Sequence, residues 1–168
     1  MRPYLFVILM TACARHEAPP PRAAIDEWDV AQRNTATELL GVGYAVNKEP
    51  VPDRQTRVRK LAKDAQHRNF YNYAVTLSRR CIAPGAAGED PREASTVEAL
   101  YRALNAITSY ELRDDILIGE TYALARADVA KLGPQIERDE SLEASLRACL
   151  EQNTTSVAAE LTGRPPKP

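Results

Sequence analysis

The residues in this chain that could do chemistry are few and far apart. There are two histidines, His16 and His67, and three cysteines, Cys13, Cys81 and Cys149. They form no Cys-x-x-Cys or His-x-x-x-His pair, and the acids form no closely spaced calcium loop, so we expect neither a metal nor a cofactor. A catalytic histidine needs a nucleophile and an orienting carboxylate. No such motif surrounds His67, which we interpret as a solvated or helix-packed residue.

The acidic residues offer one alternative chemistry. Four of them gather within ten positions: Glu111, Asp114, Asp115 and Glu120. Paired carboxylates hydrolyse glycosidic bonds when an apolar setting holds one of them protonated. Glu111 and Asp115 would share a face of a helix, but acids beside a helix break are commonly caps or solvent-facing groups. A hydrolase is therefore the alternative hypothesis, and we favour a non-catalytic protein.

The first residues are typical of an export signal. Arg2 precedes an apolar run over residues 5–10 and small residues at 11–14, which is the pattern of a secretory signal peptide. The segment Leu9-Met10-Thr11-Ala12-Cys13 resembles the lipobox of bacterial lipoproteins, in which the cysteine is acylated and becomes the mature N-terminus. The resemblance covers residues 1–13 and implies lipidation at Cys13. With Ala14 after the cysteine, it implies an outer-membrane anchor that faces the periplasm.

Two other interpretations of this segment stay open. Ala12-Cys13-Ala14 also fits an A-x-A cleavage site, which would release a soluble periplasmic protein. Alternatively, the segment forms a buried N-terminal helix. The proline-rich stretch over residues 14–24 favours the lipoprotein, because such a composition suits an extended tether.

The remaining chain predicts an all-α bundle of four to five helices over residues 25–163, followed by a proline-rich tail over 164–168. Apolar residues recur at helical spacing, and we find no convincing alternation typical of a strand. Predicted helices begin at Asp26, Asp53 and Pro91, the last after a cap at Asp90. A break within 109–115 and a stop at Gly133-Pro134 would separate two more helices; one continuous helix over 91–132 is the alternative. The last helix is expected over 135–162, with Gly163 as its cap.

Cys81 and Cys149 fall on inward faces of two of these predicted helices. An oxidising compartment would allow them to pair, and the bond would join the end of the second helix to the last helix. The alternative is two buried free thiols, which behave as small apolar groups. We predict the disulfide.

Charge is distributed unevenly along the chain. Residues 54–80 hold eight basic residues against Asp64 alone, an excess of +7, whereas residues 89–160 hold 15 acidic and 7 basic residues. The basic helix could simply be attracted to acidic neighbours in the same fold. Alternatively, its outward residues dock an acidic partner, an anionic lipid head group or a cell-wall polymer. We place such a face on residues that lie away from the apolar arc of the helix: Arg57, Lys60, Arg68 and Tyr71.

Composition limits the classes of function. The chain has 168 residues, of which 27% are charged and 44% hydrophobic, with a net charge of −1; this indicates one globular domain and argues against a dedicated nucleic-acid binder. We therefore expect a lipid-anchored, non-catalytic protein that binds another envelope protein. By analogy, it would be an accessory lipoprotein of a secretion or conjugation apparatus, or an immunity-type inhibitor of a periplasmic toxin. The alternative is an envelope enzyme acting on cell-wall glycan or lipid through the acidic cluster.

Overall fold

The computed structural model describes residues 34–46, 51–82, 91–115 and 120–162. Three strands and four helices follow one another in these ranges, with a single 3-10 turn, Val129–Lys131, before α4. Their bounds are β1 Glu38–Val46, α2 Val51–Cys81, α3 Pro91–Ala106, β2 Thr108–Asp115, β3 Glu120–Asp128, α4 Leu132–Arg138 and α5 Ala144–Leu161. The strands form one antiparallel sheet in the order β1-β3-β2. The fold is therefore mixed α/β, and the prediction of an all-α bundle is wrong.

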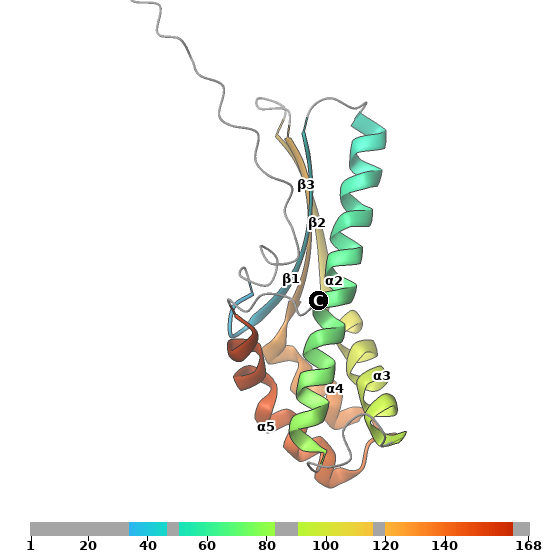
Figure 1. Cartoon of the computed structure of the whole chain (residues 1–168), viewed down its shortest axis with the longest axis vertical. Coiled ribbons are helices and arrows are strands. Elements are labelled where there is room, and N and C mark those ends of the chain that lie inside the picture. Colours follow the sequence, from blue (N-terminus) through green and yellow to red (C-terminus); the bar gives the residue numbers. More distant parts are fainter. Residues whose placement is uncertain (1–33, 47–50, 83–90, 116–119, 163–168) are drawn as a thin grey trace, which may run out of the picture.

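Helix α2 packs against both the sheet and other helices. It has 31 residues and runs along most of the length of the fold (Figure 1). Its N-terminal half lies beside the sheet, and its C-terminal half lies among α3, α4 and α5 (Figure 1). One helix thus belongs to two layers with different neighbours.

Small side chains let α2 lie directly on the sheet. Gly41 and Gly43 of β1 pair with Ala125 and Ala123 of β3, and all four residues are buried. A Cβ atom added to Gly43 would lie only 1.9 Å from the carbonyl oxygen of Val58 in α2. The helix and strand backbones are therefore in contact at a distance that only glycine permits.

A larger core holds the helical half together. Its buried residues include Phe70, Tyr73 and Leu77 of α2, Leu100 of α3 and Leu150 of α5. The Tyr73 hydroxyl donates a hydrogen bond to the backbone oxygen of Thr154, at 2.9 Å, and burial raises the pKa of this phenol. The only polar atom of the largest buried side chain is thus satisfied across the α2–α5 contact.

The helices expected at the middle of the chain are confirmed. The helix expected from Asp53 to about residue 82 is α2, and the helix expected to begin at Pro91 is α3. The described part of the first predicted helix is instead β1. The break expected within 109–115 is strand β2, and the described part of the helix expected after it is mostly β3. A continuous helix over 91–132 is therefore also wrong.

The C-terminal region differs from expectation as well. Gly133 and Pro134 lie in the first turn of α4 rather than ending a helix, where proline is tolerated because its missing N–H has no partner there. Residues 139–143 separate α4 from α5, so the expected last helix is two helices. Asp139 accepts hydrogen bonds from the hydroxyl and backbone N–H of Ser141; the hydroxyl bond is the main cause that lowers the pKa of Asp139.

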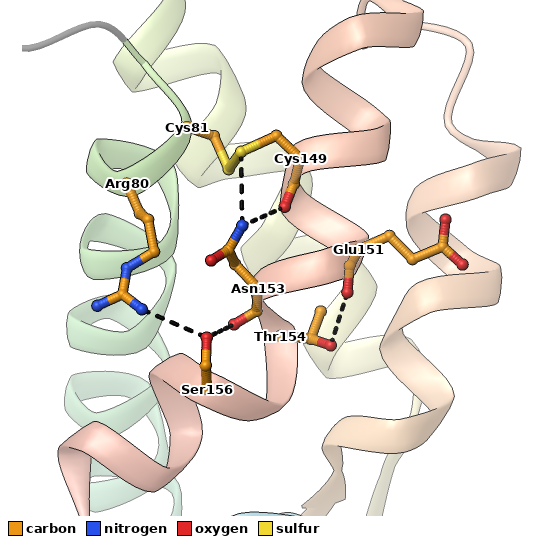
Figure 2. The surroundings of a disulfide bond; sticks show 7 residues. All are labelled: Arg80, Cys81, Cys149, Glu151, Asn153, Thr154 and Ser156. Carbon is orange, nitrogen blue, oxygen red and sulfur yellow. Dashed lines mark hydrogen bonds between the residues drawn. A yellow bond between two sulfur atoms is a disulfide. The ribbon is translucent and has the colours of Figure 1, made fainter.

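The predicted disulfide is confirmed. Cys81, at the end of α2, is bonded to Cys149 of α5, and their Cα atoms are 5.7 Å apart, within the usual range for a disulfide. Figure 2 shows the amide of Asn153 turned toward this bond. Its nitrogen donates to the backbone oxygen of Cys149, at 2.8 Å.

Several predictions concern segments outside the described residues: the signal sequence with Cys13, the tether over 14–24, the cap at Gly163 and the tail over 164–168. Among the described helices, none combines the length and the apolar character that a membrane span requires.

Candidate binding surface

The basic residues of α2 divide into two groups along the helix. At its C-terminal end, Arg79 pairs with Glu93 of α3 through an Nε–Oε1 contact of 2.7 Å, and Arg80 pairs with Glu160 of α5. Attraction to acidic neighbours within the fold therefore accounts for the charges at this end.

The four residues proposed as a binding face lie on the N-terminal and central parts of α2. Arg57, Lys60, Arg68 and Tyr71 are all exposed, Tyr71 to 52%. At 100° per residue they fall within an arc of about 80°. We call these four residues the α2 face. The exposed carboxylate of Asp64 lies within the same arc, so the face has both signs of charge.

A groove runs beside the α2 face, between α2 and the sheet. It has a volume of about 350 Å³, and Arg59, Ala62 and Lys63 of α2, Tyr110, Glu111 and Leu112 of β2, and Ala123 of β3 line it. We call it the α2–β2 groove. Arg59 and Lys63 are exposed. Across the part of the chain that the structure describes, neither they nor Lys60 forms an ion pair.

Tyr110 is the most exposed large apolar side chain among the described residues, at 61%, but its hydroxyl forms a hydrogen bond. It donates to Oε1 of Gln66 on α2, at 2.5 Å, and Nε2 of Gln66 donates to Oδ1 of Asn105, at 3.0 Å. The ring of Tyr110 therefore lines the groove and is exposed to solvent, while the hydrogen bond of its hydroxyl fixes its position.

The α2–β2 groove depends on β2 and β3, so the predicted all-α fold contains no such groove. One signal was present: Tyr110 and Leu112 alternate with Ser109 and Glu111, which is the period of a strand with one apolar face.

The remaining candidate residues from the sequence are His67 and the acidic cluster. His67 is exposed and contacts α3, because its Nδ1 lies 2.7 Å from the hydroxyl of Tyr101. Of the acidic cluster, Glu111 is exposed on β2, while the side chains of Asp114, Asp115 and Glu120 lie outside those described. Glu111 and Asp115 both belong to β2, a strand rather than a helix.

Within the described ranges, no group of three or more His, Cys, Asp or Glu side chains could hold a metal ion. The sequence matches no protein-family model, and no characterised protein is significantly similar to it. Charge, exposure and geometry are therefore the basis for a functional proposal.

Proposed function

We propose that this chain is a non-catalytic, lipid-anchored protein of the bacterial envelope that binds an acidic region of another envelope protein through the α2 face. The observation that carries the proposal is the contrast between the two ends of α2. Arg79 and Arg80 are neutralised inside the fold, whereas Lys60 has no ionic partner among the described residues. A cation that no described acid neutralises is available to an external acid.

The composition of the α2 face suits a protein partner. Tyrosine and arginine are the residue types that contribute most energy at interfaces, and exposed charges accelerate association more than they raise affinity. Asp64 adds selectivity, since a partner must avoid placing an acid opposite it. A purely anionic surface such as a lipid layer would gain less from this mixed pattern.

The anchor belongs to the same proposal. Acylation at Cys13 would hold the chain at the outer membrane, and the segment over 14–24 would carry the folded part away from it into the periplasm. Both specific roles suggested by the sequence, secretion or conjugation accessory and immunity-type inhibitor, need such a tethered partner-binding domain.

The test is a charge reversal on the α2 face. Tagged full-length chain first captures its partner from detergent-solubilised envelopes, and association with that partner is then measured. We expect Arg57→Glu with Lys60→Glu to slow association about tenfold at low salt, with a difference that shrinks as salt rises. Helical content and the melting temperature should stay nearly unchanged, because both residues are exposed.

The matched control reverses Lys131 and Arg138 to glutamate. Both are exposed and lie away from the α2 face, and the 3.6 Å contact of Lys131 with Asp128 is a surface pair of little energetic value. The control should not slow association. If the α2 reversal instead lowers the melting temperature and leaves association unchanged, the basic residues act within the fold and the proposal is wrong.

A further inference from the structure

Strand β2 lies at an edge of the sheet. In the order β1-β3-β2 it pairs with β3 on one side, and no described strand pairs with its other side. An edge strand presents a row of N–H and C=O groups that can pair with another extended chain. Adding a strand to such an edge is a common way of binding a peptide.

The α2–β2 groove lies along the face of this strand that is turned toward α2. Leu112 is partly buried and packs against Val58, Ala62 and Ala123, so the floor is apolar. Tyr110 forms a wall that the Gln66 hydrogen bond holds in place. The groove can therefore accept an apolar side chain that projects from a strand added beside β2.

The rim of the groove is mainly positive. Arg59 and Lys63 stand one helical turn apart on α2, at i and i+4, and within the described ranges no acid pairs with either. Glu111 is the single carboxylate of the lining and comes from β2. Charge complementarity thus favours an incoming segment with acids on its α2 side.

We propose that the α2–β2 groove binds an extended, acidic segment of a partner protein, which adds to the sheet as a fourth strand beside β2. On the side facing α2, this segment would place an apolar residue over Leu112 and acids opposite Arg59 and Lys63. The inference rests on the proposed function, since it specifies the chemistry of the partner. A second copy of this chain is a poorer occupant, because pairing β2 with itself would bring two sets of Arg59 and Lys63 toward each other.

The test uses a synthetic peptide and the full chain purified in detergent. The labelled peptide has eight residues, the length of β2, with threonine on one face and alternating glutamate and valine on the other. We expect it to bind about tenfold more tightly than the same peptide with lysine in place of glutamate. Binding should slow hydrogen exchange at alternate backbone amides of β2.

Variants locate the peptide. Arg59→Glu with Lys63→Glu should weaken binding about tenfold, and the exposed control Arg138→Glu should leave it unchanged. Both should retain the melting temperature of the wild-type chain, because the reversed residues are exposed. Two further peptides are N-methylated at odd or at even amides. At least one should lose binding, because it cannot donate to the edge of β2.

Four results would overturn the inference: no binding of the acidic peptide, undiminished binding of both N-methylated peptides, loss of binding only in the Arg57 and Lys60 reversal, or concentration-dependent pairing of the chain through Arg59 and Lys63. The same experiments distinguish a failure of this inference from a failure of the proposed function. If the envelope partner depends on the α2 face but the peptide does not bind, the inference alone is wrong. If the peptide binds and the α2 reversal has no effect on the partner, the inference about the groove is supported and the proposed role of the α2 face is wrong.

Discussion

Glycine at positions 41 and 43 removes the side-chain layer that usually separates a helix from a sheet. A Cβ atom on Gly41 would lie 2.6 Å from the carbonyl oxygen of Ala62, and one on Gly43 would lie 2.8 Å or less from two backbone atoms of Val58. Backbone atoms cannot rotate away as a side chain does, so a methyl group here must move the whole helix.

We therefore expect Gly43→Ala to lower the free energy of unfolding by about 2–3 kcal/mol, the usual cost of overpacking. Urea denaturation monitored by circular dichroism measures this change. The comparison is Gly133→Ala in α4, where the added Cβ would lie 3.4 Å from Cγ of Glu151, a flexible side chain. Alanine should be neutral there or stabilise by up to about 1 kcal/mol. Equal losses at both positions would show that α2 and β1 are not in backbone contact.

The elements that the sequence predicts well are the helices with a clear apolar face. In α2, Val58, Ala62 and Ala65 face the sheet, while Tyr73 and Leu77 face the helical core. The same spacing places Arg57, Lys60, Arg68 and Tyr71 on the opposite side, and they are exposed. The positions of the α2 face could thus be inferred from helical periodicity alone.

Strands β1 and β3 could not be recognised from apolar periodicity, because small and large residues alternate along them rather than apolar and polar ones. In β1 and β3 the buried positions next to α2 are glycine and alanine, between larger neighbours such as Val42 and Leu124. Alanine has the highest helix propensity, so Ala123, Ala125 and Ala127 favoured a helix. What selected the strand was the close approach of α2, a tertiary contact that no local pattern reports.

The disulfide is the covalent contact between two helices, α2 and α5. Its cysteines are 68 positions apart, and the chain-entropy model gives about 4 kcal/mol for a loop of that size. This is a large part of the 5–15 kcal/mol that stabilises a typical domain. We expect Cys81→Ser with Cys149→Ser to lower the free energy of unfolding by about this amount, measured by urea denaturation.

The double variant should remain folded, because the Tyr73 hydrogen bond and the apolar contacts of α5 persist. Its control is the reductant itself: dithiothreitol should destabilise the wild-type protein and leave the double variant unchanged. A wild-type protein indifferent to reductant would contradict a stabilising role for the bond.

At the scale of the whole molecule, α2 extends through two regions with different properties. The half beside the sheet contains the α2–β2 groove with Arg57 and Lys60 of the α2 face, while the other half contains the disulfide and the two ion pairs with α3 and α5. A disulfide and ion pairs thus lie at one end, whereas Arg59, Lys60 and Lys63 near the other end have no ionic partner among the described residues. This arrangement suits the proposed binding of a partner at the sheet end.

The proposed lipid anchor is tested at Cys13. We expect mass spectrometry of the mature N-terminus to find an acylated Cys13, and Cys13→Ser to release the protein from the membrane fraction, because acyl chains supply the apolar area that anchors it. The double variant Cys81→Ser with Cys149→Ser should stay in that fraction, which separates lipidation from disulfide formation. An unmodified N-terminus at Arg15 would instead show soluble export.

The Cys81–Cys149 bond also makes a ring out of the middle of the chain. That ring encloses α3, β2, β3 and α4, while β1 lies outside it. A protease that cuts once inside the ring opens it without releasing a fragment, so both pieces stay joined and near one another at a high effective concentration. A nicked molecule could therefore keep β3 paired with β1, and its damage would be visible only after reduction.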